Sequence, residues 1–259
     1  MGLITEVILL LLVYYVLLFL LGQKLENNSI VDIGWGLGFV LVAWLSALRG
    51  NNSPPGTVIV VLVTLWGLRL SWHIGKRNIG KGEDYRYVEM RKKWGDQFPR
   101  LKAFGEVYLL QGVLLMIIAL PIYMSHIYSA NALNVWGVLG LAVWISGFVF
   151  EAVGDAQLRA FLRNPDNKGK IMRSGLWRYT RHPNYFGEST MWWGIWLISL
   201  NLMPFYVALA SPVVITYLLV FVSGVPLTEK AFEGNEAFQE YAKVTSRFFP
   251  WFPKRESRS

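Results

Sequence analysis

Hydrophobic residues occur in seven long runs that are separated by polar segments. A helix that crosses a bilayer needs about 20 mostly apolar residues. The runs of suitable length lie at residues 2–22, 30–48, 57–74, 106–125, 133–153, 185–202 and 204–225. Almost no loop joins the last two runs, so they could instead form one bent helix. The pattern predicts an all-α integral membrane protein with about seven transmembrane helices.

The composition of the chain agrees with this class of protein. Of its 259 residues, 54% are hydrophobic and only 16% are charged, whereas soluble domains carry about 25% charged residues. The chain has no cysteine, which excludes disulfide scaffolds, thiolate metal sites and cysteine nucleophiles. Its three histidines, His73, His126 and His182, are too scattered to suggest a zinc site. We therefore expect no bound metal.

Positive charge is concentrated in three segments of the chain. The formal net charge is +8, and residues 75–105, 154–184 and 226–259 carry nine, seven and six of the 25 lysines and arginines. The hydrophobic fraction makes a lipid bilayer a better partner for this charge than nucleic acid. Basic segments stay on the cytosolic side of a membrane, so we expect the N-terminus outside and the C-terminus in the cytosol. Compact loops favour a bacterial inner membrane, or the endoplasmic reticulum if the chain is eukaryotic.

Glu6 and the lack of a basic start distinguish the first run from a signal peptide, and we expect it to remain as a helix. No repeat is present, so one membrane domain is the simplest organisation. Within it we expect residues 1–105 to form the substrate side and residues 106–259 the cofactor-binding part.

Five ionisable residues lie at the ends of the hydrophobic runs. They are Asp32, Arg69, His73, Glu151 and Glu188. A charge at membrane depth is costly, so such residues are candidates for function, although residues at the ends of spans can also reach the interface or pair with one another. In the predicted topology all five fall in the cytosolic leaflet. They could converge on one cavity that opens to the cytosol.

Helical spacing connects four charged residues after the fifth run. Glu151, Asp155, Arg159 and Arg163 recur every four residues and form one stripe if the helix continues past the membrane. The like-charged pair Glu151 and Asp155 favours a donor ligand such as a ribose hydroxyl or a carboxamide. A solvated helix face is the alternative. The segment 164–167, Asn-Pro-Asp-Asn, then ends the helix.

The segment 175–188 carries the densest set of polar residues. Pro183 suits the first turn of a helix, and Arg173, Arg178 and Arg181 surround that helix start. Free N–H groups and arginines together form the kind of anion site that holds phosphates. Asn184 and Glu188 lie one turn apart and suit a carboxamide or sugar hydroxyls. A simple interfacial anchor is the alternative. Gly34, Gly36 and Gly38 follow no strand, so we interpret them as helix-packing positions.

The motif Arg181-His-Pro-Asn-Tyr-Phe-Gly-Glu188 resembles the C-terminal domain of the steroid 5-alpha-reductase family. The end of the fifth run and the tail Tyr241-x-x-x-Thr245-Ser-Arg-Phe-Phe-Pro-Trp-Phe-Pro253 are also similar to that family. The N-terminal half, from Ser29-Ile-Val-Asp-Ile-Gly-Trp-Gly36 to Glu83-Asp-Tyr-Arg-Tyr87, is similar to a mostly bacterial branch of it.

The resemblance implies an integral membrane reductase that uses NADPH to reduce the carbon–carbon double bond of a lipophilic enone. Its substrate would be a 3-oxo-delta-4 steroid or a similar apolar lipid. The residues that we expect to bind the cofactor are Glu151, Asp155, Arg159, Arg163, Arg173, Arg181, His182, Asn184, Glu188 and Tyr241. By position in the motif, Asn184 and Glu188 match residues at the nicotinamide end.

The substrate side departs from the family pattern. The steroid enzymes carry a Gln-Glu pair in the second span and a tyrosine in the third, where this chain has Asp32 and Trp66. The His-rich stretch of the last helix is replaced by Thr228-Glu-Lys230. Protonated Asp32 is the first candidate for the proton donor, followed by Tyr179 and Tyr185. Trp35, Trp66 and Arg69 are the expected substrate contacts.

Two other functions fit parts of the sequence. Membrane methyltransferases that use S-adenosylmethionine, of the isoprenylcysteine or phospholipid kind, share the segment Arg181-His-Pro-x-Tyr185. Asn184, Glu188 and the charged stripe favour a dinucleotide instead. A non-catalytic scaffold is the third possibility, since a nuclear-envelope receptor is built on a sterol-reductase domain. The substrate and the oligomeric state are not defined by the sequence.

Overall fold

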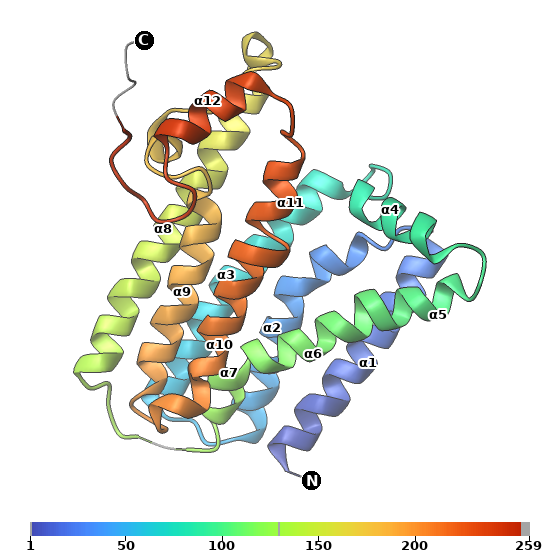
Figure 1. Ribbon diagram of the computed structural model, residues 1–259. Coiled ribbons are helices and arrows are strands. Elements are labelled where there is room, and N and C mark those ends of the chain that lie inside the picture. Colours follow the sequence, from blue (N-terminus) through green and yellow to red (C-terminus); the bar gives the residue numbers. More distant parts are fainter. Residues whose placement is uncertain (1, 129, 255–259) are drawn as a thin grey trace. The chain divides into compact units, whose positions relative to one another are not determined.

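The computed structural model describes residues 2–128 and 130–254, and within them all regular structure is helical (Figure 1). Six helical segments are long and apolar enough to cross a membrane. They are Leu3–Lys24, Ile30–Arg49, Pro54–Asn78, Pro99–Ile118, Val135–Arg163 and Tyr206–Lys230. The remaining predicted run forms helix α9, Pro183–Ser199, of 17 residues. The all-α membrane fold class is therefore confirmed, while the number and direction of the spans stay predictions.

The chain divides into two compact units, Met1–Asn134 with Ser199–Ser211, and Val135–Ile198 with Pro212–Ser259. The helices of the first unit are α1 (Leu3–Lys24), α2 (Ile30–Arg49), α3 (Pro54–Asn78), α4 (Tyr85–Trp94), α5 (Pro99–Ala103), the π-helix η1 (Phe104–Leu109), α6 (Leu110–Ile118) and α7 (Leu120–Met124). Helix α10 (Phe205–Tyr217) begins in this unit and ends in the other.

Glycines bring the helices of the first unit into close contact. A Cβ atom on Gly36 of α2 would lie 2.4 Å from the carbonyl oxygen of Gly67 on α3. Gly34 leaves room for the side chains of Leu18 and Tyr14 of α1, and Gly38 leaves room for those of Tyr14 and a residue of α6. Small residues of this kind allow helix backbones to approach in a membrane. The interpretation of these glycines as packing positions is confirmed.

The fourth hydrophobic run does not form one regular helix. Its helical segment begins at Pro99, passes through the π-helix η1 and the α-helix α6, and breaks at Ala119 before α7. Pro121 lies directly after the break and has no N–H to continue the hydrogen-bond ladder. The prediction of one span over 106–125 was wrong in this respect.

The second unit contains a long helix, α8 (Val135–Arg163), and the shorter elements that follow it. These are the 3₁₀ turns η2 (Pro165–Asn167) and η3 (Gly175–Arg178), α9 (Pro183–Ser199), the π-helix η4 (Leu218–Val222), α11 (Val225–Lys230) and α12 (Glu236–Val244). Because α9 and α10 are separate helices, the last two runs do not form one bent helix.

Helices α8 and α9 cross with their backbones in contact. A Cβ on Gly147 would lie 2.6 Å from the carbonyl oxygen of Gly187, and a Cβ on Gly140 would lie 2.6 Å from that of Gly194. Both glycine pairs are seven residues apart on their helices, so they mark one continuous seam. Any side chain in this seam would force the two helices apart.

We predict that Gly147→Ala destabilises the protein, because the new methyl group meets backbone rather than a flexible side chain. Overpacking of this kind costs about 1–3 kcal/mol. Thermal unfolding of the purified protein in detergent measures the effect. Gly105→Ala is the matched control, because nothing lies within 4 Å of its Cβ position. Equal melting temperatures of the two variants would contradict the close crossing.

Candidate functional site

The charged stripe of the long helix α8 is present as predicted. The helix continues to Arg163, and Asn164 begins the next turn by accepting a 3.0 Å hydrogen bond from the Asp166 N–H. Glu151 and Asp155 are buried, with 2% and 5% of their surface exposed, whereas Arg159 and Arg163 are exposed. Two acidic groups of the stripe therefore lie inside the protein and its two arginines at the surface.

The loop before α9 is held against α8 by two side chains. The Gln157 side-chain oxygen accepts a 2.9 Å hydrogen bond from the Leu176 N–H, and the Trp177 indole N–H donates to the Gly154 carbonyl at 3.1 Å. Gly175 has a φ of +62°, a left-handed conformation that favours glycine. The turn at Gly175 thus has both a required backbone shape and a fixed position.

The start of α9 lies against the buried acidic part of α8. Pro183 is the first residue of α9, as predicted. A Cβ on Gly154 would lie 3.4 Å from the Asn184 nitrogen, and the Glu151 backbone lies against Gly187. The buried side-chain oxygen of Asn184 accepts no hydrogen bond within the described part of the chain. Glu188, one turn later, is 8% exposed.

Arg181 and His182 both bind Glu229 of α11. Arg181 donates to a Glu229 oxygen at 2.9 Å and to the Ala242 carbonyl at 2.9 Å, and His182 Nε2 lies 3.0 Å from the same Glu229 oxygen. Arg247 lies 3.5 Å from the second oxygen. Glu229 was not among the predicted site residues. Two arginines and a histidine surround Glu229, so Arg181 and His182 join the motif to the C-terminal segment.

A basic pocket lies beside this junction. Its volume is about 760 Å³, and the described residues that line it are Arg173, Ser174, Gly175, Arg178, Tyr241, Val244, Thr245, Pro253 and Lys254. Three of them are cationic and none is acidic. Arg173 lies 5.8 Å from the centre of the Tyr241 ring, and its nearest carboxylate, Glu240, is 4.0 Å away and mostly exposed. The pocket is therefore suited to an anion.

A smaller pocket adjoins the basic one and shares Ser174 and Gly175 with it. Its volume is about 290 Å³, and its other lining residues are Gln157, Ala160, Phe161 and Met172. The Phe161 ring and the Met172 thioether offer apolar contacts, and the Gln157 amide offers one hydrogen-bonding group. The two pockets together accommodate a ligand with a charged part and a flat part.

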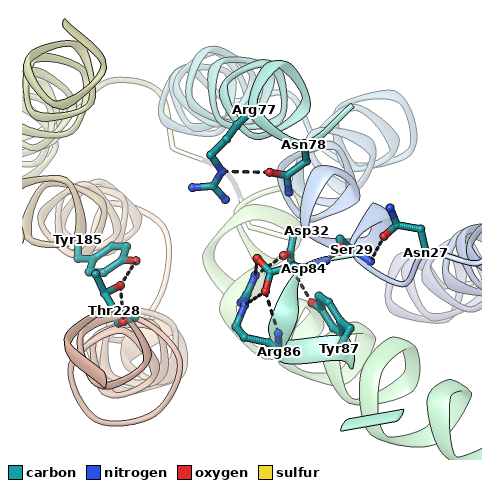
Figure 2. Close-up of polar contacts among 11 residues, drawn as sticks. Asn27, Ser29, Asp32, Arg77, Asn78, Asp84, Arg86, Tyr87, Tyr185 and Thr228 are labelled. Atoms are coloured by element: carbon teal, nitrogen blue, oxygen red, sulfur yellow. Dashed lines mark hydrogen bonds and ion pairs between the residues drawn. The ribbon is translucent and has the colours of Figure 1, made fainter. Parts of the chain in front are cut away.

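The two tyrosines predicted as alternative proton donors have partners in the second unit. The Tyr185 hydroxyl lies 3.0 Å from the Thr228 hydroxyl, as Figure 2 shows, and its ring stacks on His182. The Tyr179 carbonyl accepts from the Trp251 N–H at 2.9 Å, while its ring lies near Phe252. Buried Tyr241 donates from its hydroxyl to the Trp177 carbonyl.

In the first unit, Asp32 belongs to a charged cluster that also contains Asp84, Arg86 and Tyr87 (Figure 2). One Asp32 oxygen accepts from Arg86 at 2.7 Å, and the other accepts from the Tyr87 hydroxyl at 2.6 Å. Arg86 also contacts Asp84 at 2.9 Å. Both Asp32 oxygens therefore act as hydrogen-bond acceptors, and the role of Asp32 as a proton donor stays a prediction.

The segment that supplies Arg86 and Tyr87 is anchored to the start of α2. The Asp84 N–H donates to the Ser29 hydroxyl at 2.7 Å, and Glu83 accepts from the Asn28 N–H at 2.8 Å. Burial raises the pKa of Asp84, but the hydrogen bonds from Arg86 outweigh it and the net pKa is lowered. Burial beside Asp32 raises the pKa of Tyr87, so its hydroxyl keeps its proton.

The predicted substrate contacts also lie in the first unit. Trp35 and Trp66 both contact Phe39, with ring centres 5.2 and 5.4 Å from it. Trp66 is only 2% exposed, so in this structure it has the position of a core residue. Arg69 follows on the same helix and is half-buried. The predicted cofactor residues, in contrast, all belong to the second unit.

Comparisons with known proteins find that this chain is similar to one protein family, to a yeast protein and to one mammalian enzyme. The family described as "Protein of unknown function (DUF1295)" matches residues 18–245. An uncharacterized protein of Schizosaccharomyces pombe is 27% identical over 273 residues, which cover 90% of this chain and 77% of the yeast protein. No solved structure matches the chain at a significant level.

Shorter matches occur to 3-oxo-5-alpha-steroid 4-dehydrogenase 1 of several mammals. The Mus musculus enzyme is 42% identical over 71 residues, which are 27% of this chain and 28% of the enzyme. The Homo sapiens enzyme is 40% identical over 63 residues, which are 24% of each chain. The matched part spans about a quarter of these enzymes.

We predict that His182 makes the stability of the protein depend on pH. Burial lowers the pKa of His182, although the hydrogen bond to Glu229 opposes this. In the unfolded chain the pKa of His182 is about 6.5, so the unfolded chain binds more protons than the folded one as the pH falls below that value. The contribution of neutral His182 to the free energy of unfolding is complete above about pH 6.5 and is lost as the pH falls below that value.

Unfolding by denaturant from about pH 7.5 to about pH 5 measures this dependence. We expect a smaller loss of stability in His182→Gln than in the parent protein, because glutamine can still bond Glu229 but does not titrate. Identical pH profiles would contradict a buried neutral His182.

Proposed function

We propose that this chain, which belongs to the DUF1295 family, is an NADPH-dependent membrane reductase that acts on the carbon–carbon double bond of a lipophilic enone. The observation that carries the proposal is the pocket with three cationic residues between the loop before α9 and the C-terminal segment. The names of the mammalian relatives support a reductase of this kind, and they suggest a 3-oxo steroid or a similar lipid as substrate.

The residues of the second unit fit a phosphorylated dinucleotide. Arg173, Arg178 and Lys254 would hold its phosphate groups, because guanidinium and ammonium groups bind phosphate oxygens strongly. The smaller adjoining pocket, with Phe161 and Met172, is suited to a flat base. The unsatisfied oxygen of Asn184 would accept the N–H of a carboxamide. Bound NADPH supplies a hydride.

Arg181 and His182 act in this proposal as positioning residues. Their ion pair and hydrogen bond to Glu229 connect the start of α9 to α11. Arg181 also holds the backbone of the C-terminal segment through the Ala242 carbonyl. They would therefore fix the walls of the nucleotide site without contacting the phosphates. This differs from the direct phosphate contact that the motif suggested for Arg181.

Reduction of an enone also requires a proton donor for the developing enolate. We propose that Tyr87 fills this role in the first unit and that Asp32 and Arg86 orient its hydroxyl. Tyr87 keeps its proton and is held at 2.6 Å from Asp32. Both Asp32 oxygens accept hydrogen bonds from Arg86 and Tyr87, whereas the Tyr87 hydroxyl carries the proton of this pair. An apolar substrate would reach the protein laterally from the bilayer.

We predict that Arg178→Gln weakens NADPH binding by about 10- to 100-fold, since a hydrogen bond to a charged group contributes roughly 1.5–3 kcal/mol. Fluorescence titration of NADPH with the detergent-purified protein measures this. Arg100→Gln removes the same charge from an exposed position outside the pocket and should bind as the parent does. Failure of the parent protein to bind millimolar NADPH would overturn the proposed function.

We predict that Tyr87→Phe lowers the turnover of lipophilic enones by about 100- to 10,000-fold, because general acid catalysis contributes about that much. NADPH affinity should be unchanged, since the described residues that line the basic pocket all belong to the second unit. Consumption of NADPH with a panel of 3-oxo-delta-4 steroids is the assay. Tyr85→Phe, two residues away and exposed, is the control. Normal turnover of Tyr87→Phe would remove Tyr87 from the reaction.

A further inference from the structure

Three large aromatic side chains of the C-terminal tail point out of the protein. Phe249, Trp251 and Phe252 are 70%, 73% and 77% exposed. They are close together in the sequence, whereas Phe248 beside them is buried. A cluster of this size on the surface marks a place where another apolar phase or partner is bound.

The tail that carries these side chains is held rigidly by the motif before α9. Its backbone bonds begin with the Arg181 N–H, which donates to the Ser246 carbonyl at 2.9 Å. The Thr180 hydroxyl donates to the Phe248 carbonyl at 2.8 Å, and the Trp251 N–H donates to Tyr179. The outward direction of the aromatic cluster is therefore fixed by the fold and does not depend on a loose chain end.

The contacts of Phe249 show which part of α9 and α8 lies beside the tail. Its ring centre lies 6.1 Å from that of Phe186 on α9, which in turn lies 5.2 Å from that of Phe150 on α8. Helix α8 carries no charged residue from Val135 to Phe150, and its first charged residue is Glu151. Phe249 thus lies level with the place where α8 changes from apolar to charged.

Positive residues surround the aromatic cluster. Arg247 precedes it and is 46% exposed, Lys254 follows it, and Arg178 lines the same pocket as Lys254. Aromatic rings with lysine or arginine beside them are typical of the interface between the hydrocarbon core and the lipid headgroups. The cations also complement a surface of anionic lipid. This combination matches a bilayer surface better than a second protein.

We propose that Phe249, Trp251 and Phe252 insert into the headgroup region of the bilayer, with Arg247 against anionic lipid headgroups. The tail would then be fixed from two sides, by the motif before α9 and by the membrane. Because Val244, Thr245, Pro253 and Lys254 form one wall of the basic pocket, the bilayer also supports that wall.

The absence of cysteine from the chain makes a direct test possible. A nitroxide label is attached to Trp251→Cys, to Phe252→Cys as a second position, and to Gln239→Cys on the exposed side of α12 as the control. The full-length protein is placed in vesicles of phosphatidylcholine alone or mixed with phosphatidylglycerol. The accessibility of each label to oxygen and to a water-soluble nickel chelate is then compared.

We expect labels at positions 251 and 252 to be more accessible to oxygen than to the chelate, and the label at 239 to show the reverse. Phosphatidylglycerol should increase this difference at 251 and 252. Equal chelate access at 251, 252 and 239 would overturn the proposal. Spin–spin broadening between labels at 251 in separate chains would overturn it in favour of a second copy of the protein.

Discussion

The contact between the backbones of α8 and α9 determines where the polar groups of the second unit can lie. At Gly147 and Gly187 the two helices meet without a side chain between them. The first charged residue of α8, Glu151, follows one turn after Gly147. On α9, Glu188 directly follows Gly187. Both carboxylates are buried, with 2% and 8% of their surface exposed, and a buried charge is costly unless donor groups face it. The close approach of the two helices therefore fixes the depth at which both acidic groups lie.

The cations near this crossing fall into two groups with different physical roles. Arg181 is half-buried and neutralised by Glu229, which also binds His182. Arg173 and Arg178 instead line an open pocket that contains no carboxylate among its described residues. Only the second group keeps enough uncompensated charge to attract an anion. Arginines close together in the sequence therefore have different roles, since Arg181 holds the chain together and Arg173 and Arg178 supply positive charge to the pocket.

Regular patterns in the sequence predicted the structural features that depend on residues close together in the chain. The length of α8, its end at Asn164 and the start of α9 at Pro183 follow from helical spacing and from proline and asparagine chemistry. The break at Ala119 was missed because the run on either side of it is continuously apolar. Hydrophobicity reports that a segment is buried in lipid and carries little information about its local geometry.

Partners far apart in the chain could not be predicted. Asp32 and Tyr87 are 55 residues apart, and Arg181 and Glu229 are 48 apart. Their contacts arise only after the helices have packed, so no local spacing reveals them. The same holds for Lys254, which reaches the basic pocket because the tail folds back onto the motif. Sequence reasoning found residue types suited to the chemistry, but it could not separate those that bind each other from those that face a ligand.

The dinucleotide site proposed in the basic pocket is tested most directly by a thermal-shift measurement on the detergent-purified protein with NADPH and with S-adenosylmethionine. A ligand present at a hundred times its Kd stabilises the folded state by about 2.7 kcal/mol. We expect NADPH to raise the melting temperature and S-adenosylmethionine to leave it unchanged. Stabilisation by S-adenosylmethionine without any effect of NADPH would contradict a dinucleotide site in the basic pocket.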